Sequence, residues 1–342
     1  MTSPTAIAAG TEALARPQEQ QSYKNLPRPP IFAGRQRPGR GANPSGYLHI
    51  YTTASELSTA LSAQRSAGKT VGFVPTMGAL HAGHAALLHA SAAACDVTVA
   101  SVFVNPTQFN EAADLDAYPR TPEADAALLA AAGCDLLYLP DVADVYPRGT
   151  QVAATRGFDF GSLVDRMEGA HRPGHFEGVV QVVSRLLDIV RPDALFMGQK
   201  DYQQVAVVRR MIELLGLTVR LQTVATVREA DGLALSSRNR RLSAEERAAA
   251  ASINRQLTAV VAGLETGWPA RTLERLALDD MTARPLLDPE YVEVVDGDTL
   301  LPYRDGDPVR ELVVATAVRV GSVRLIDNRI AAPANPYTTR RV

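Results

Sequence analysis

Residues 71–84 read Val71-Gly-Phe-Val-Pro-Thr-Met-Gly-Ala-Leu-His-Ala-Gly-His84, and this stretch decides the fold because a strand pattern changes into a helix start within it. Its first four residues are typical of a buried strand. Pro75 is expected to end the strand, glycines then allow close backbone approach, and His81 and His84 stand where the helix begins. In a parallel sheet, anions bind where a strand leads into a helix N-terminus. The stretch therefore predicts an anion site.

The histidine pair in this stretch admits three interpretations. Phosphate binding is favoured because the two imidazoles would lie beside the backbone amides of the helix start. A metal site is the second, but zinc needs more ligands, and the sequence has no His-Glu-x-x-His pattern. Packing in the core or on the surface is the third. The other histidines form no close pair with a cysteine; they are His49, His89, His171 and His175.

Helical patterns and apolar β-type runs alternate on both sides of this stretch. Helices are expected at residues 55–67, 85–94, 122–132, 178–190 and 202–215. Strands are expected at residues 71–74, 97–104, 136–139, 194–197 and 219–224. Strands that alternate with helices form a mainly parallel sheet covered on both faces. The sequence therefore predicts an α/β protein with a Rossmann-like parallel-sheet domain at residues 47–226. This domain would contain the predicted anion site and bind the substrates.

The pattern changes after residue 226. A long helix is expected at 243–265, opened by Ser243 with Glu246 three residues later, which is a capping-box signature. A helix at 270–281 and extended segments at 291–295, 311–320 and 322–327 follow. We therefore expect a smaller α+β C-terminal lid domain at 227–330. Residues 1–46, rich in Pro, Gly, Gln and Arg, are expected to be a disordered extension, and residues 331–342 a tail.

The composition limits the classes of function. The 342 residues are 46% hydrophobic, and the net charge of −2 gives no basic field of the kind that binds nucleic acid or anionic membrane. No apolar run approaches the roughly 18 residues that span a bilayer. The two cysteines, Cys95 and Cys134, form no metal or redox motif and are expected to pack in the core. These features favour a cytoplasmic protein whose partners are small molecules or protein.

Six motifs in order resemble those of one enzyme family. His81-Ala-Gly-His84 resembles the His-x-Gly-His element of the nucleotidyltransferase superfamily, and the whole of Pro75 to His84 resembles that of the pantothenate synthetases, or pantoate–β-alanine ligases. The other motifs are Ser101-Val-Phe-Val-Asn-Pro-Thr-Gln-Phe109, Leu115-Asp-Ala-Tyr-Pro-Arg-Thr121, Arg172-Pro-Gly-His-Phe176, Gly198-Gln-Lys-Asp-Tyr-Gln-Gln204 and Val227-Arg-Glu-Ala-Asp-Gly-Leu-Ala-Leu-Ser-Ser-Arg-Asn239. The resemblance covers about residues 48 to 330.

The resemblance implies a reaction in two steps and a homodimer. ATP and pantoate give pantoyl adenylate and pyrophosphate, and the amine of β-alanine then attacks the acyl carbon and releases AMP. The residues implied in catalysis are His84, His81, Lys200 and Arg238, and those implied in substrate binding are Gln108, Gln204 and Pro75. The residues implied in ATP binding are Met77, Gly78, Ala79, Leu80, His81, Ala82, Gly83, His84, Gly198, Gln199, Lys200, Asp201, Val227, Leu235, Ser236, Ser237 and Arg238.

The chemistry of adenylation explains these residue types. Charge builds on the phosphate oxygens, so fixed donors and positive groups must meet it. Lys200, one of three lysines in the chain, is a flexible point charge suited to a triphosphate. Asp201 is expected either to cap the next helix or to bind the ribose. His84 is expected either to transfer a proton or to stabilise phosphate charge, with the electrostatic role slightly favoured.

Adenylation also needs a divalent cation on the phosphates. The family's acidic cluster corresponds here to Pro122-Glu-Ala-Asp-Ala126, in which Ala124 stands where some relatives have another acid. Mg²⁺ is therefore expected to be held mainly by ATP, and Asp125 is the candidate protein ligand.

Two other functions fit part of the pattern. Another nucleotidyltransferase would need the histidine pair, but it would not need Gln108, Gln204 or the Ser236-Ser-Arg-Asn239 motif. A tRNA synthetase would also need an anticodon-binding region or a basic face, and the chain has no evident one. A non-catalytic binding protein with the same fold would not need the motifs intact. Release of AMP and pyrophosphate that depends on both pantoate and β-alanine would separate these functions.

Overall fold

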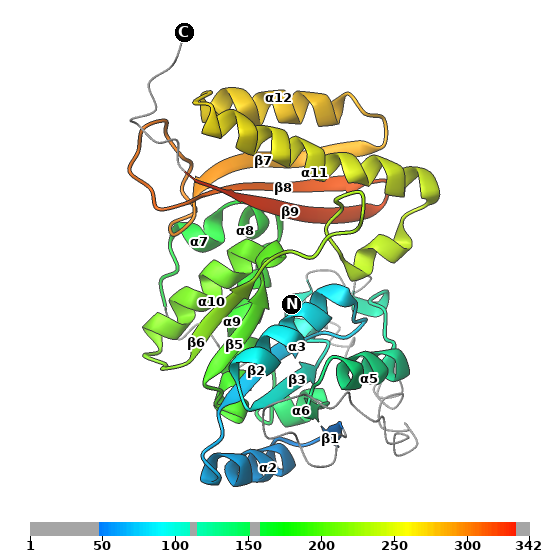
Figure 1. Ribbon diagram of the computed structural model, residues 1–342, viewed down its shortest axis with the longest axis vertical. Helices are drawn as coiled ribbons and strands as arrows, with labels where there is room; N and C mark the ends of the chain where they lie inside the picture. Colours follow the sequence, from blue (N-terminus) through cyan, green and yellow to red (C-terminus); the bar gives the residue numbers. More distant parts are fainter. Residues whose placement is uncertain (1–47, 110–114, 151–157, 333–342) are drawn as a thin grey trace, which may run out of the picture.

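The computed structural model describes residues 48–109, 115–150 and 158–332 (Figure 1). The predictions of a disordered extension at residues 1–46 and of a tail over most of 331–342 therefore concern residues outside the described ranges. Within those ranges the chain folds into two units, each built on its own sheet.

The first unit is built on a parallel sheet. Its strands in spatial order are β1 (His49–Tyr51), β4 (Leu136–Tyr138), β3 (Val97–Val102), β2 (Val71–Thr76), β5 (Ala194–Gly198) and β6 (Arg220–Val224). Every adjacent pair is parallel. The chain runs outward from β2 through β3 to β4 and then returns to β5 on the other side of β2. The switch point, where ligands bind in such sheets, therefore lies between β2 and β5.

Helices cover both faces of this sheet because each has an apolar side. One face packs against α2 (Ala54–Ser66), α9 (His175–Val190) and α10 (Tyr202–Leu214), and the other against α3 (Ala82–Ala94) and α5 (Pro122–Ala131). In α9, buried Val179, Val183, Leu186 and Val190 recur at helical spacing. Three short helices complete the unit: α6 (Val142–Val145), α7 (Ser162–Asp165) and α8 (Glu168–His171).

The predicted α/β fold of this unit is confirmed, with shifted element ends. α3 begins at Ala82 and not at residue 85, because the side chain of His81 caps it by accepting a hydrogen bond from Gly83 N–H. α9 begins at His175, before the predicted residue 178. β1 and the short helices have no predicted counterpart, because they are too short to show a period.

The prediction that Pro75 ends its strand is wrong. β2 continues to Thr76, and Pro75 stands opposite Ser101 of β3. On its other side β2 pairs with β5 only at Gly72 and Phe73. Beyond them β2 has a paired neighbour on one side only, so a residue without an N–H group fits there.

The second unit is an antiparallel sheet covered by two long helices. It contains η3 (Ser237–Arg241), α11 (Ala244–Glu265), α12 (Ala270–Thr282) and strands β7 (Leu287–Asp296), β8 (Leu312–Val320) and β9 (Val323–Ala331), in the order β7-β8-β9. Figure 1 shows α11 and α12 across the outer face of this sheet. The capping box of Ser243 and Glu246 is confirmed. β9 extends past the predicted end at residue 327, because its pairing with β8 continues to Ala331.

The inner face of the small sheet packs on the first unit. Val295, Val313 and Ala315 of this sheet belong to the same apolar core as α9 and α10. Figure 1 shows α7 and α8 beside this contact. Because the two units share a core, their division at residue 226 stays an interpretation.

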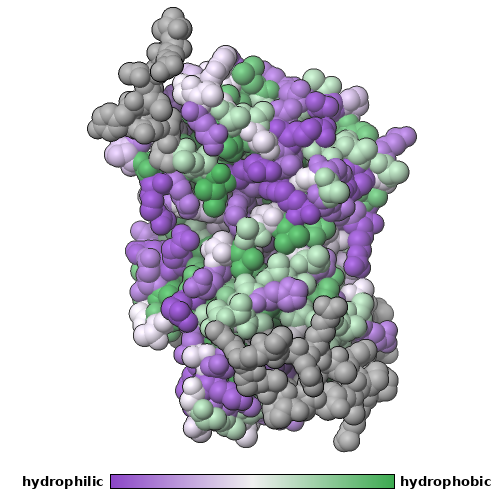
Figure 2. Space-filling model, in the orientation of Figure 1, coloured by the Kyte–Doolittle hydropathy of each residue, from purple (hydrophilic) through white to green (hydrophobic). Residues whose placement is uncertain are grey.

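The surface shown in Figure 2 has hydrophilic and hydrophobic residues interspersed over α11 and α12. None of the helices in the described ranges is long and apolar enough to cross a membrane. Cys95 and Cys134 are buried thiols, as predicted.

Candidate active site

A cavity lies at the carboxyl ends of β2 and β5, at the switch point of the parallel sheet. Its walls come from the first turn of α3, from η1 (Pro106–Gln108), from α9 and from η2 (Gln199–Asp201). The start of the second unit, residues 227–238, lines another side of it. The cavity is therefore where the predicted segments should meet.

One carboxylate holds the turn between β2 and α3. Gly78 and Ala79 have φ of 84° and 50°, in the left-handed region that strains any residue with a Cβ. Buried Asp125 of α5 accepts hydrogen bonds from the backbone N–H groups of Ala79 (3.0 Å) and Leu80 (2.8 Å). Thr121 Oγ1 donates to the same carboxylate at 3.0 Å. These bonds offset the strain and fix the direction in which the chain enters α3.

His81 and His84 lie together at the start of α3, with ring centroids 4.2 Å apart. The backbone N–H of His81 donates to Nδ1 of His84 at 3.2 Å, and that of Gly83 donates to Nδ1 of His81 at 3.1 Å. Because each Nδ1 is an acceptor, the hydrogen of each neutral ring is assigned to Nε2. Both rings line the cavity, where Nε2–H can donate to an anion. A Cβ at Gly83 would lie 2.8 Å from Cε1 of the His81 ring, so a larger residue there would displace that ring.

Burial keeps both imidazoles neutral. Burial, followed by the charge of Lys200, lowers the pKa of His81 to about 4. Burial, followed by the neighbouring His81, lowers the pKa of His84 to about 3. Near neutral pH these rings therefore supply hydrogen-bond donors and no positive charge.

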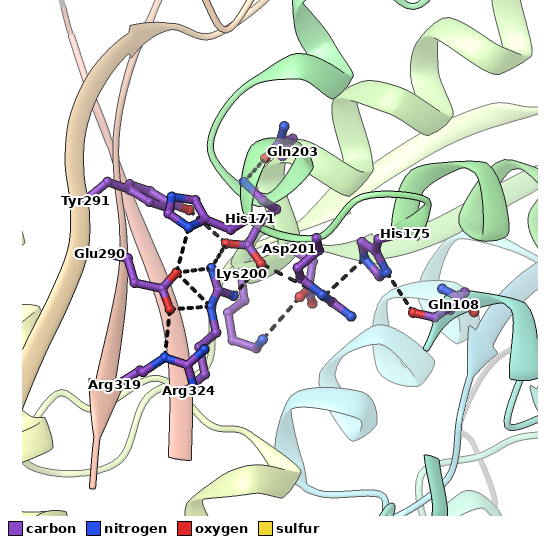
Figure 3. Close-up of polar contacts among 12 residues, drawn as sticks. Gln108, His171, His175, Lys200, Asp201, Gln203, Glu290, Tyr291, Arg319 and Arg324 are labelled. Atoms are coloured by element: carbon purple, nitrogen blue, oxygen red, sulfur yellow. Dashed lines mark hydrogen bonds and ion pairs between the residues drawn. The ribbon is translucent and has the colours of Figure 1, made fainter. Parts of the chain in front are cut away.

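Lys200 supplies a positive charge to the cavity. Its side chain is 19% exposed, and Nζ donates to Oδ1 of Asp201 at 3.2 Å (Figure 3). Burial acts to raise the pKa of Asp201, but the charge and hydrogen bond of Lys200 outweigh it and lower that pKa. Asp201 precedes α10 and makes no side-chain cap hydrogen bond. Asp201 therefore occupies the predicted cap position of α10 without a side-chain hydrogen bond to the helix, and its carboxylate lines the cavity.

Gln108 is held in place from two sides. Asn105 Nδ2 donates to Gln108 Oε1 at 3.2 Å, which leaves Nε2 of Gln108 as the donor for a ligand. A Cβ at Gly178 of α9 would lie 2.2 Å from the carbonyl oxygen of Thr107 and 3.0 Å from Cα of Gln108. Only glycine allows α9 to approach η1 this closely. Gln204 of α10 lines the same cavity.

Ser236, Ser237 and Arg238 reach the cavity from the second unit. Ser236 caps η3, because its Oγ accepts a hydrogen bond from the N–H of Arg238 at 3.2 Å. Burial raises the pKa of the Tyr118 hydroxyl, which is hydrogen-bonded to Ser237. Tyr118 belongs to the first unit, so the two units meet at this edge of the cavity.

A network of buried and partly buried polar groups connects the second unit to Gln108 (Figure 3). Glu168 of α8 accepts hydrogen bonds of 2.6 and 2.7 Å from Arg324 of β9 and lies 3.9 Å from Arg172. Arg172 donates to Nε2 of His175 at 3.2 Å, so Nδ1 of His175 carries the hydrogen and donates to the Gln108 carbonyl at 3.1 Å. Burial, followed by the charge of Arg172, lowers the pKa of His175 to about 4.

The structure brings most of the predicted site residues around this one cavity. Those that line it are Pro75, Met77, His81, Gly83, His84, Gln108, Gly198, Lys200, Asp201, Gln204, Val227, Leu235, Ser236, Ser237 and Arg238. Predicted ATP-binding residues that do not line it are Gly78, Ala79, Leu80, Ala82 and Gln199. The first three form the turn held by Asp125, and Nε2 of Gln199 donates to Oδ1 of Asn328 at 3.1 Å.

Sequence reasoning missed several lining residues, among them Thr76, Leu87, Phe103, Tyr118, Phe196 and Thr226. Tyr118 lies inside the 115–121 motif, so a signal for it existed. The apolar residues look like ordinary core residues in the sequence. Within the described ranges, the buried Oγ1 of Thr226 has no hydrogen-bond partner, and a ligand could provide one.

Asp125 is not placed to bind a metal ion. It is 2% exposed, does not line the cavity and already accepts three hydrogen bonds. In residues 48–109, 115–150 and 158–332, no three His, Cys, Asp or Glu side chains form a group that could hold a metal ion. The prediction that Asp125 is a Mg²⁺ ligand is therefore corrected, because its oxygens hold the turn before α3.

The chain is similar to known enzymes over most of its length. The family model for pantoate-beta-alanine ligase matches residues 49–330. A pantothenate synthetase of Porphyromonas gingivalis W83 is 50% identical over 284 residues, which are 82% of this chain and 98% of the relative. That of Agrobacterium fabrum C58 is 48% identical over 286 residues, which are 83% of this chain and 96% of the relative.

Solved structures show the same similarity in three dimensions. The crystal structure of pantothenate synthetase from Thermus thermophilus matches with a TM-score of 0.76 at 43% identity, covering 82% of this chain and 98% of that one. A pantoate-beta-alanine ligase from Francisella tularensis, complexed with beta-gamma ATP and beta-alanine, matches with a TM-score of 0.67 at 29% identity, covering 83% and 97%.

Proposed function

Because the chain belongs to the pantoate–β-alanine ligase family, we propose that it joins (R)-pantoate to β-alanine with ATP, giving pantothenate, AMP and pyrophosphate through pantoyl adenylate. The observation that carries this proposal is the convergence on one cavity of the Nε2–H donors of His81 and His84, the charge of Lys200 and the amide of Gln108. The Francisella relative, which holds beta-gamma ATP and beta-alanine, supports ATP as a substrate.

In the first step, a carboxylate oxygen of pantoate forms a bond to the α-phosphorus of ATP, and the bond to pyrophosphate breaks. Negative charge grows on the phosphate oxygens as this happens. The neutral Nε2–H groups of His81 and His84 would donate to these oxygens, and Lys200 and Arg238 would supply the positive charge. Gln108 and Gln204 would hold the hydroxyl and carboxylate groups of pantoate by hydrogen bonds.

In the second step, the unprotonated amine of β-alanine attacks the acyl carbon, and the bond to AMP breaks. The proton released from nitrogen passes to water. Nδ1 of His84 already accepts the backbone N–H of His81, so His84 would lose that bond by taking a proton there. We therefore assign His84 the role of a neutral hydrogen-bond donor, in place of an acid or a fixed charge.

Mg²⁺ is expected to travel with ATP. Among the described residues no three His, Cys, Asp or Glu side chains group together to hold an ion, and Asp125 is buried. Mg²⁺ commonly binds nucleotide phosphates while keeping several waters, which suits a cavity without a carboxylate cluster. None of the steps assigned to the protein here depends on a protein ligand to the metal.

The test is an assay of AMP and pyrophosphate release with ATP, pantoate and β-alanine, each omitted in turn. We expect AMP release to require all three compounds. Another nucleotidyltransferase would not require both pantoate and β-alanine, and a non-catalytic protein would release no AMP. Either result would refute the proposed function.

The role of His84 is tested by His84→Asn, with His89→Asn as the matched control. Asparagine can still accept the backbone N–H of His81 through its oxygen but has no group in the place of Nε2–H. We expect a loss of adenylation rate on the order of 10²-fold. His89 is exposed on the same helix, and its variant should keep the wild-type rate.

We also propose that the protein is a homodimer of the cytoplasm. The dimer is expected from the family, and the cytoplasm is consistent with the two buried thiols. Light scattering coupled to size exclusion would test the first, and cell fractionation the second. A monomer at micromolar concentration would refute the dimer.

A further inference from the structure

The turn that carries Lys200 is held by a residue of the second unit. Asn328 of β9 is 2% exposed, and its Nδ2 donates to the carbonyl oxygens of both Gln199 and Lys200, at 2.9 Å each. Its Oδ1 accepts from Nε2 of Gln199 at 3.1 Å. The amide thus uses both its hydrogens and its oxygen on η2, and the two carbonyl acceptors leave no other orientation of the group.

Asn328 is itself fixed by its neighbours. Arg228 makes a bidentate ion pair with Asp327, at 2.7 and 2.9 Å, and also donates to the carbonyl oxygen of Asn328 at 3.1 Å. The backbone N–H of Asn328 donates to Asp327 at 2.7 Å. The pairing of β9 with β8 places Asn328 opposite Ala315, inside the core shared by the two units. Asn328 therefore provides a rigid base for the turn.

The turn has no side-chain cap within the first unit. Gly198, the N-cap of η2, has no side chain, and Asp201 makes no cap hydrogen bond to the α10 helix that follows. Beyond η2, the hydroxyl of Tyr202 also reaches into the second unit, to the carbonyl of Gly297 at 3.0 Å and to Glu311 at 2.8 Å. The segment from residue 199 to 202 thus makes side-chain hydrogen bonds to the second unit at both of its ends.

We propose that Asn328 is a positioning residue for Lys200. By orienting the peptide groups of Gln199 and Lys200, it sets the direction in which the lysine side chain leaves the turn and meets the phosphates. The second unit is then part of the catalytic apparatus as well as a cover, because one of its side chains determines the place of a charge in the first unit. This inference rests on the proposed ligase function.

The test is a double-mutant cycle between Asn328→Asp and Lys200→Met. Aspartate has the shape of asparagine but would turn an oxygen toward the two carbonyl oxygens. In the otherwise wild-type enzyme we expect Asn328→Asp to lower the adenylation rate by about 10-fold or more, because small misplacements of a catalytic group are costly. In the Lys200→Met enzyme the same change should alter the remaining rate by less than about 2-fold, since its effect passes through Lys200.

Thr316→Val is the matched control for general damage to the sheet. Thr316 is 1% exposed, lies on β8 opposite Asp327, and donates to the carbonyl of Tyr291 at 2.6 Å, and it does not line the active-site cavity. Its variant should lower the melting temperature and keep the wild-type adenylation rate. If Asn328→Asp does not fold, Gln199→Ala loosens the same contact without a buried charge and should show the same dependence on Lys200.

The outcomes separate the two proposals. A wild-type enzyme that releases no AMP from ATP and pantoate with β-alanine refutes the proposed function. An active wild-type enzyme with wild-type rates in both the Asn328→Asp and the Gln199→Ala variants overturns the positioning role. The positioning role is also overturned if Asn328→Asp lowers the adenylation rate by the same factor in the Lys200→Met enzyme as in the wild type. That result would show that Asn328 acts independently of the lysine.

Discussion

Replacing Asp125 with asparagine tests whether this residue anchors the turn after β2 or binds a metal ion. Oδ1 accepts from the N–H of Leu80 and the hydroxyl of Thr121, and Oδ2 accepts from the N–H of Ala79. Asparagine keeps one oxygen, which should take the position that faces two donors. Its NH₂ group then faces the N–H of Ala79, which loses its acceptor.

The cost of this change comes from geometry and not from charge. Burial outweighs the hydrogen bonds and keeps the pKa of Asp125 above its usual value, so ionisation itself gains nothing from the site. Ala79 is already strained at φ 50° and relies on this bond. A buried N–H without an acceptor costs about 1–3 kcal/mol, and we expect Asp125→Asn to lower the free energy of unfolding by about 2 kcal/mol.

Urea denaturation measures the free energy of unfolding, and a Mg²⁺ titration of the adenylation rate measures the dependence on metal. Glu123→Gln is the control, because Glu123 is an exposed acid in the same first turn of α5. It should change the free energy of unfolding by less than about 0.5 kcal/mol. Asp125→Asn should leave the Mg²⁺ concentration for half-maximal rate unchanged.

One pattern of results would refute the anchoring role of Asp125. In that pattern, Asp125→Asn unfolds at the same urea concentration as the wild type, while the Mg²⁺ concentration for half-maximal rate rises several-fold. Asp125 would then be a metal ligand, as the sequence suggested.

Two further predictions concern the support of Gln108. Gly178→Ala places a Cβ 2.2 Å from the carbonyl oxygen of Thr107, so η1 must move. In steady-state kinetics we expect the KM for pantoate to rise about 10-fold, while the KM for ATP stays within about 2-fold of the wild-type value. An unchanged KM for pantoate would contradict this reasoning. His175 has a pKa of about 4 when folded and about 6.5 when unfolded, so the unfolded state binds more protons between these values and stability falls as pH falls through this window. The asparagine of His175→Asn cannot titrate, so the free energy of unfolding should depend less on pH, with a slope smaller by up to about 1.4 kcal/mol per pH unit. Urea denaturation from pH 5 to 7 measures this slope. The same slope in the variant and the wild type would contradict the prediction.

The elements of the first unit were largely predictable, because their signals lie in neighbouring residues. An apolar run followed by a turn and a helical period predicts β2 and α3 without knowledge of the rest of the chain. The exact residues at which helices and strands begin and end were less predictable. α3 starts at Ala82 because the side chain of His81 caps it. β2 continues through Pro75 because β5 does not pair with it there. Short elements such as β1 carry no period that could reveal them.

The sequence by itself determined which residue types gather around the cavity. His81, His84 and Lys200 stand in local motifs after β2 and β5, and parallel strands bring such ends to one edge of the sheet. Their chemistry could therefore be predicted as phosphate binding before their positions were known.

Only the tertiary structure decided what these residues do at the cavity. Asp125 accepts a hydrogen bond from an amide 45 residues away, and Asn328 donates one to a carbonyl 129 residues away, so no local pattern could show either contact. The neutral state of His84 depends on its burial, and its tautomer on one backbone amide. The physical reason is that a polar side chain acquires its role from the partner that packing places within about 3 Å of it, and packing is a property of the whole fold.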